Sequence, residues 1–144
     1  MNRIESFRKI CKEQGIKVTP QRTAIFDALE DSRDHPTAEI IFQAIRKRFP
    51  TISLDTVYRT LMTFVKIGIA HVVETQGNTK RFDANMEIHH HAHCLKCGKI
   101  LDFYSADYDN LEVPQEIRNQ FTVMDKKVVI HGVCKKCSQK QKDL

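Results

Sequence analysis

Apolar residues recur every three or four positions in the first half of the chain, which is the spacing of amphipathic helices. One such pattern covers residues 2–14 and ends at Gly15. Two further helices are expected after Thr19 and after Thr37, because a threonine just before an apolar periodic run is a good N-cap. Cys11 falls on the apolar side of the first helix and is therefore expected to be a small core residue.

The fourth expected helix, residues 53–66, is the most informative of these elements. One side of it carries a continuous apolar stripe. The opposite side is predicted to carry mostly short hydroxyl side chains and one arginine: Asp55, Thr56, Arg59, Thr60 and Thr63. Such a face can read base edges and phosphates in the DNA major groove. An ordinary solvated helix face has the same composition, and this helix alone does not decide between the two.

The next residues predict a β-hairpin, with strands at 69–75 and 79–83 around a turn at 76–78. Three helices followed by a hairpin give the order of a winged-helix domain. Lys80 then lies near the tip of the wing, where it would touch phosphate. The candidate DNA-binding residues are Ser53, Thr56, Tyr58, Arg59, Thr60 and Lys80.

The second half is expected to be rich in strands after a hinge at residues 84–88. Strands are predicted at 89–93, 99–103, 121–124 and 127–133, a helix at 111–120, and a basic, frayed tail at the end. The expected fold class is therefore α+β. The winged-helix domain would cover residues 1–83, and a small metal-binding domain residues 89–144.

The charge of the chain supports a nucleic-acid partner for the first half. The net charge is +5 and the pI is about 9.0. Residues 1–83 carry 14 Lys and Arg against 10 Asp and Glu, whereas residues 84–144 carry 9 against 8. The first residues lack the apolar segment of a signal peptide, and no apolar run approaches the roughly 18 residues of a membrane span. A soluble, cytoplasmic protein without a membrane partner is therefore expected.

Four of the five cysteines form two C-x-x-C motifs, Cys94 with Cys97 and Cys134 with Cys137. In a cytosolic protein this spacing is typical of a metal site or a redox dithiol, and not of a disulfide framework. Two such turns supply a tetrahedral shell of four thiolates, which suits Zn²⁺ and leaves no open position. We therefore predict one structural Zn²⁺ per subunit, with a pair of redox dithiols as the alternative.

Histidines alternate just before the first C-x-x-C motif. On a strand, His89, His91 and His93 would point to one face and His90 to the other. Imidazoles on one face form half of a mixed nitrogen and oxygen site that suits Fe²⁺, Mn²⁺ or Zn²⁺. Candidates for its remaining ligands are Asp83, Glu87, Asp102 and His35. Spacing alone does not choose among them.

Taken in order, these motifs resemble the ferric uptake regulator family of metal-dependent repressors, over nearly the whole chain. They include Val18-Thr-Pro-Gln-Arg22, His35-Pro-Thr-Ala38, Thr56-Val-Tyr-Arg59, Arg81-Phe-Asp83, His89-x-His91 and the two C-x-x-C pairs. The resemblance implies a homodimer that binds a palindromic operator in double-stranded DNA, with residues 89–144 as an α/β dimerisation domain. It also implies the ligands of the second metal, which are His35, Asp83, His89, His91 and Asp102.

The chain looks most like the branch of that family that senses peroxide. That branch has aspartates at the positions of Asp83 and Asp102, where the iron-dosage branch tends to have glutamates. The resemblance implies one regulatory Fe²⁺ or Mn²⁺ per subunit, which acts as co-repressor. It further implies that peroxide oxidises His35 and His89 of the Fe²⁺ form and so releases the DNA. The alternative is a repressor of the same family that responds to the dosage of iron or another divalent metal.

An enzyme is not expected. Five protein ligands leave little room for a substrate, and the pattern contains no separate general base. Two histidines, His93 and His131, are not positions that the common pattern of the family uses, and neither has an assigned role.

Overall fold

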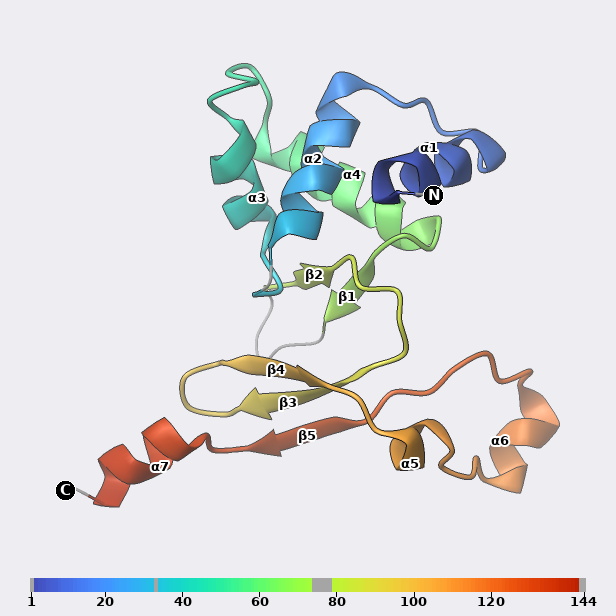
Figure 1. Cartoon of the computed structure of the whole chain (residues 1–144), viewed down its shortest axis with the longest axis vertical. Coiled ribbons are helices and arrows are strands. Elements are labelled where there is room, and N and C mark those ends of the chain that lie inside the picture. Colours follow the sequence, from blue (N-terminus) through green and yellow to red (C-terminus); the bar gives the residue numbers. More distant parts are fainter. Residues whose placement is uncertain (1, 33, 74–78, 143–144) are drawn as a thin grey trace. The chain divides into compact units, whose positions relative to one another are not determined.

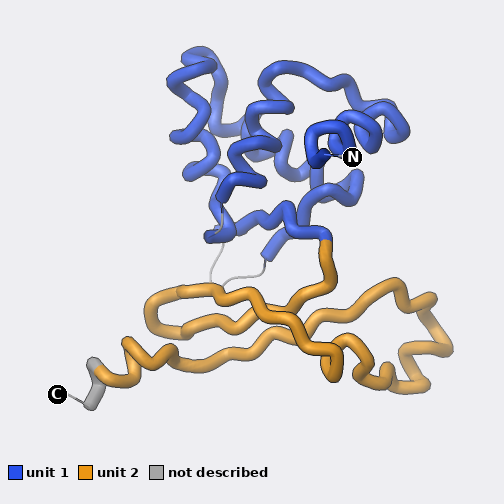
Figure 2. Tube along the Cα trace, in the orientation of Figure 1, with its two compact units in different colours: residues 1–86 blue, residues 87–144 orange. Residues whose placement is uncertain are grey.

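The computed structural model describes residues 2–32, 34–73 and 79–142, and the chain forms two compact units, Met1–Met86 and Glu87–Leu144 (Figures 1 and 2). The elements of the first unit are α1 (Arg3–Glu13), α2 (Pro20–Asp31), α3 (Ala38–Ile45), α4 (Leu54–Lys66), β1 (His71–Val73) and β2 (Arg81–Asp83). Those of the second are β3 (His90–Cys94), β4 (Ile100–Phe103), α5 (Ala106–Asp109), α6 (Gln115–Gln120), β5 (Val129–Gly132) and α7 (Lys135–Lys142). Within the described residues, no helix has the length and apolar character that crossing a membrane requires.

The helices of the first unit begin at side chains that satisfy their first backbone N–H groups. Thr19, Thr37 and Ser53 each accept a hydrogen bond from the N–H three residues ahead, at 3.2, 3.2 and 3.0 Å. This confirms the predicted caps. Asn2 caps α1 in the same way and forms a reciprocal capping box with Glu5.

The hydrophobic core of the described chain lies in the first unit. Its centre is a group of three aromatic rings, in which Phe7 stacks on Phe26 at 4.5 Å between centroids and both meet Phe64 edge-on. Phe82 of β2 is completely buried and joins the same cluster. Cys11 is completely buried as well, and this burial raises the pKa of its thiol. Cys11 is thus a core residue, as its place on the helix predicts.

The second unit is built on a three-stranded sheet of order β4-β3-β5, with β3 antiparallel to β4 and parallel to β5 (Figure 1). Its buried interior is not a hydrocarbon core. Among the described residues of this unit, the buried side chains are His89, His90, His91, His93 and Cys94. Large apolar side chains lie exposed instead, among them Leu101, Tyr104, Leu111, Phe121 and Met124. A unit of this size without an apolar core needs another source of stability.

Several predictions for the second unit were wrong. The expected helix at 111–120 is only α6, which starts after Pro114, because proline disfavours helical backbone in the residue before it. Residues 121–124 form no strand. The short helix α5 was not predicted. The expected frayed tail is helix α7 as far as residue 142.

The β-hairpin of the first unit is confirmed where it is described. β1 pairs antiparallel with β2, and His71 lies opposite Asp83. The paired strands are shorter than the predicted ranges. The predicted turn at 76–78 lies outside the described residues.

Candidate metal centres and nucleic-acid interface

The four cysteines of the two C-x-x-C motifs come together in the second unit, with all four sulfurs within 4.8 Å of one another. The sulfurs of Cys97 and Cys134 are 3.8 Å apart. Two sulfurs bound to one zinc at about 2.3 Å and a tetrahedral angle are about 3.8 Å apart, so the cluster fits a four-thiolate zinc site. The first motif occupies the turn between β3 and β4, where Gly98 has a φ of 76° and its N–H reaches the carbonyl of Cys94 at 3.0 Å.

The electrostatics of this cluster also call for a cation. Backbone N–H groups of Cys134 and Cys97 point at the sulfur of Cys94, at 3.3 and 3.5 Å, and lower the pKa of its thiol to about 5. The pKa of Cys137 is raised to about 12, first because its side chain hydrogen-bonds Cys134. Without a cation the cluster therefore favours a mixture of thiolate and thiol, because four adjacent thiolates repel one another. A divalent ion such as Zn²⁺ would allow all four to ionise.

One half of the predicted regulatory site lies within the first unit, where Nε2 of His35 and Oδ2 of Asp83 are 3.6 Å apart. The other oxygen of Asp83 accepts the backbone N–H of Asn85 at 2.8 Å, which orients the carboxylate. Two ligand atoms that each lie about 2.1 Å from one ion, at angles of 90–120°, are about 3–3.6 Å apart. This pair fits such a shell. Both side chains are largely buried, at 4% and 12% exposed.

The backbone at His35 is held in a conformation that few side chains adopt. Its φ is 53°, in the left-handed region, which costs a non-glycine residue about 1–2 kcal/mol. Contacts on both sides of it hold the strand β2 against this loop. The carbonyl of Pro36 accepts the N–H of Phe82 at 2.9 Å, and the guanidinium of Arg81 donates to the carbonyl of Asp34 at 3.3 Å. The fold thus places His35 next to Asp83 at the end of β2.

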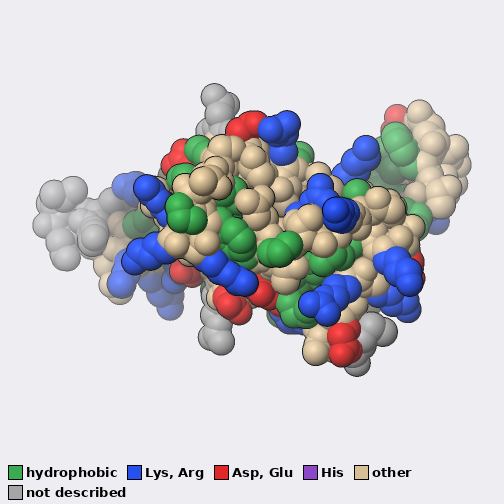
Figure 3. Space-filling model, turned by 90° about the horizontal axis from the view of Figure 1, so that it is seen from above, with side chains coloured by type: hydrophobic (Ala, Val, Ile, Leu, Met, Phe, Trp, Pro, Cys, Tyr) green, Lys and Arg blue, Asp and Glu red, His purple; other side chains and the backbone are tan. Residues whose placement is uncertain are grey.

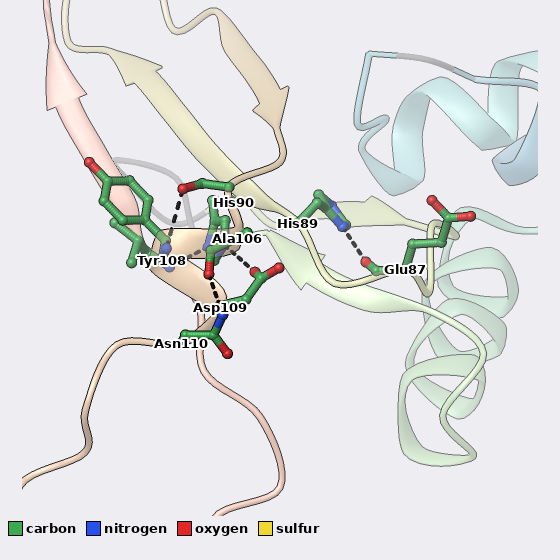
Figure 4. A network of polar contacts seen from close by, with 9 residues as sticks. Glu87, His89, His90, Ala106, Tyr108, Asp109 and Asn110 are labelled. Atoms are coloured by element: carbon green, nitrogen blue, oxygen red, sulfur yellow. Dashed lines mark hydrogen bonds and ion pairs between the residues drawn. The ribbon is translucent and has the colours of Figure 1, made fainter.

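The other predicted ligands lie within the second unit. His91 of β3 pairs with Asp102 of β4, and Nε2 of His91 is 3.1 Å from Oδ1 of Asp102. The rings of His89 and His91 are perpendicular, with centroids 4.8 Å apart. Nδ1 of His89 lies 2.6 Å from the backbone carbonyl of Glu87 (Figure 4). A carbonyl only accepts, so Nδ1 carries the proton and Nε2 carries the lone pair that a metal requires.

Glu87, a candidate ligand from the sequence, contributes this backbone carbonyl to the orientation of His89. The two ligand sets thus belong to different units. His35 and Asp83 are brought together in the first. His91 and Asp102 are brought together in the second, where the ring of His89 contacts that of His91 but His89 is not among the grouped ligand atoms.

His90 has a role that the sequence pattern did not reveal. Its Nδ1 accepts the backbone N–H of Val128 at 3.0 Å, so its Nε2 carries the proton and donates to Asp109 at 2.7 Å (Figure 4). The ring also packs against Phe103 and Tyr108. His90 therefore joins β3, α5 and the chain that leads into β5. The predicted alternation of the histidines was the available signal, since it set His90 apart from its neighbours.

The candidate DNA-binding residues lie mainly along α4 and next to it. Ser53, Tyr58 and Arg59 are exposed, and Thr56 is half-buried. Arg59 forms an ion pair with Asp55 one turn earlier, at 2.8 Å. The ammonium of Lys80 lies 5.8 Å from the centre of the Tyr58 ring, so the hairpin contacts α4 at this point. The face seen in Figure 3 carries Lys and Arg side chains spread among apolar, uncharged and acidic ones.

Thr60 does not lie where it was predicted. Only 8% of it is exposed, and its hydroxyl donates to the carbonyl of Thr56 at 2.7 Å. The reason is its spacing, because Thr60 is three residues after Val57 and four before Phe64, both completely buried. The predicted place of Thr60 on the exposed face was therefore wrong.

Comparison with known proteins agrees with this geometry. The profile of the Ferric uptake regulator family matches residues 13–131. The chain belongs to this family. A relative in it, the peroxide-responsive repressor PerR of Staphylococcus epidermidis, is 40% identical over 128 residues, which are 89% of this chain and 85% of that protein.

Solved structures of the family are also similar. The ferric uptake regulator of Helicobacter pylori, described as having three functional metal-binding sites, superposes with a TM-score of 0.74 at 28% identity and covers 94% of this chain and 91% of its own. PerR from Streptococcus pyogenes, described for peroxide sensing and gene regulation, gives a TM-score of 0.57 at 28% identity over 95% and 94% of the two chains. The mixed helices and strands of this chain, together with these likenesses, confirm the α+β class predicted from the sequence.

Proposed function

We propose that this chain is a homodimeric, metal-dependent transcriptional repressor that loses its DNA when peroxide oxidises its regulatory site. The observation that carries the proposal is the presence, in each unit, of a histidine and an aspartate at a distance suited to one metal ion. These pairs are His35 with Asp83 and His91 with Asp102. Both carboxylates are aspartates, and the PerR relative at 40% identity supports the peroxide-responsive reading.

The regulatory site would be completed by His89, so that His35 and Asp83 of one unit share an ion with three ligands of the other. Such sharing favours one arrangement of the two units, because only that arrangement satisfies all five ligands. Moving an equilibrium from 1:99 to 99:1 needs about 5.5 kcal/mol of differential affinity. A structural Zn²⁺ site supplies roughly 10–16 kcal/mol in total, so a metal site can supply this difference. In that arrangement, the α4 helices of the two subunits would enter successive major grooves of a palindromic operator.

Fe²⁺ held by these five residues would supply the redox chemistry by which H₂O₂ transfers one oxygen atom to an imidazole and leaves as water, whereas Mn²⁺ would fill the site without this chemistry. His35 and His89 are the residues that would gain an oxygen atom. In His89 the nitrogen whose lone pair is available to the metal is Nε2, because Nδ1 carries the proton that is donated to the carbonyl of Glu87. An oxidised ring no longer offers that lone pair, and the arrangement favoured for DNA binding is lost.

Two surfaces support the remaining parts of the proposal. Ser53, Thr56, Tyr58, Arg59 and Lys80 would contact DNA, with the cations on phosphates and the α4 residues in the major groove. The exposed apolar side chains of the second unit would form the homodimer interface. Burying them against a second copy would give that unit the apolar contacts that its own fold lacks.

A repressor that responds to metal dosage without oxidation is the alternative within the family, and DNA binding separates the two. Protein loaded with Fe²⁺ or Mn²⁺ is titrated onto operator DNA before and after one equivalent of H₂O₂, and peptides are then weighed by mass spectrometry. We expect only the Fe²⁺ form to lose DNA, with an added oxygen on His35 or His89. If the protein loses DNA while both histidines stay unmodified, the repressor responds to metal dosage and not to oxidation. Continued consumption of peroxide over many turnovers would indicate an enzyme.

A further inference from the structure

His93 and His131 are the two histidines of the second unit that neither the proposed metal sites nor the His90 contacts use. They lie opposite each other on neighbouring parallel strands, His93 on β3 and His131 on β5. Paired residues on neighbouring strands point to the same face of the sheet, so both imidazoles stand on the face that carries His91. Their ring centroids are 5.5 Å apart and their planes are at 88°.

This geometry is similar to that of another imidazole pair in the unit. His89 and His91 have ring centroids 4.8 Å apart and planes also at 88°. Two imidazoles that bind one ion through nitrogens at about 2.1 Å, with angles between tetrahedral and trigonal, have ring centres about 5–5.5 Å apart. The His93–His131 pair, at 5.5 Å, fits this range, and the His89–His91 pair, at 4.8 Å, lies just below it. The use of His89 and His91 as an example of a metal-binding pair rests on the proposed function. The agreement of the His93–His131 distance with metal–nitrogen geometry does not rest on it.

We propose that His93 and His131 form a further site for a borderline divalent cation that prefers imidazole ligands, namely Zn²⁺, Ni²⁺ or Cu²⁺, with water as the other ligands. His93 is only 7% exposed, so packing fixes its ring, while His131 is exposed and accessible from solvent. Two neutral nitrogens bind the ions late in the Irving–Williams order far better than Mn²⁺ or Fe²⁺. The site therefore discriminates against the ions of the regulatory centre.

Equilibrium dialysis of the full-length protein against buffered Zn²⁺, up to micromolar free ion, tests this site by the number of zinc ions bound. His131→Gln should bind one zinc ion fewer than the unmodified protein, and His71→Gln, in the first unit, should bind the same number. His89→Gln reports on the regulatory site separately. If that site fails to bind zinc, His89→Gln matches the unmodified protein while His131→Gln still binds one fewer. Equal zinc numbers for His131→Gln and the unmodified protein would overturn the proposal.

A second measurement, which leaves both His93 and His131 in place, covers the case in which His131→Gln disturbs packing. In ¹⁵N-labelled His89→Gln protein that already holds its cysteine-bound zinc, a further equivalent of Zn²⁺ should shift the ring nitrogen signals of His93 and His131 together. Ring signals that do not move at these concentrations would show that the pair only packs, and the site would be rejected.

Discussion

Replacing Cys134 by serine should unfold the second unit and leave the first unit folded. The sulfur cluster joins the turn after β3 to the residues before α7, which are some 40 positions apart in the chain. In the described chain the apolar core cluster lies in the first unit, and the second unit has histidines at its centre. The zinc site is therefore the main candidate for the stability of the second unit.

The magnitudes support a complete loss. A structural Zn²⁺ contributes roughly 10–16 kcal/mol in small domains that fold around it. The net stability of a folded domain is only about 5–15 kcal/mol. Removing a thiolate from the shell weakens the site by a large share of the first figure, which the three short strands cannot offset. The first unit keeps its aromatic cluster and should not be affected.

Limited proteolysis with mass spectrometry, combined with circular dichroism, can follow the two units separately. In Cys134→Ser we expect rapid cleavage after residue 86 and a protected fragment that ends near Met86. Cys11→Ala is the matched control, because Cys11 is a buried core thiol outside the cluster. It should retain zinc and lower the stability of the first unit by about 1–2 kcal/mol. The reasoning would be refuted if the second unit of Cys134→Ser stayed protected from the protease. It would also be refuted if both units of this variant unfolded at the same denaturant concentration.

Three further predictions concern single side chains. His90→Phe should destabilise the second unit by about 2–3 kcal/mol in urea unfolding, because it removes the hydrogen bonds to Val128 and Asp109. A stability within about 0.5 kcal/mol of the unmodified protein would contradict the role of His90 in joining β3, α5 and the chain before β5. Measured by fluorescence anisotropy, Arg59→Ala should weaken operator binding severalfold and reduce the slope of log affinity against log salt concentration by about 1. Thr60→Val should change the affinity less than twofold, because the Thr60 hydroxyl already donates its hydrogen bond within the helix. Phe121→Asp should shift the protein towards monomer in sedimentation, and a dimer as tight as before would exclude this segment from the interface.

The first unit was largely predictable because its signals are local. A capping threonine, an apolar stripe and a helix-ending glycine each act within a few residues, and Thr19, Thr37 and Ser53 all cap helices as predicted. Thr60 shows the limit of this reasoning. A hydroxyl was assigned to the polar face by its chemistry, yet a threonine can be buried when it bonds the carbonyl four residues earlier.

The second unit was less predictable because its elements depend on distant partners. Residues 121–124 have the composition of a strand, but no neighbouring strand of the described chain pairs with them. The cysteine spacing was sufficient to predict the cluster, since each motif already brings two sulfurs together. The orientation of His89 was not accessible, because it depends on the backbone carbonyl of Glu87 and not on any side chain.

The contrast between the two interiors has a consequence for how repression would end. The first unit has an apolar core that needs no ion, so the helix that would read DNA stays folded whether or not the regulatory site is filled. The second unit has a cluster of four cysteines whose zinc would hold its fold, and its imidazoles would exchange their ion without affecting that cluster. Under the proposed function, metal loss or oxidation therefore releases DNA by freeing the arrangement of two folded units and not by unfolding either one. Amide hydrogen exchange would then change around His35 and Asp83 on metal removal, while the protection of the α4 backbone stays the same.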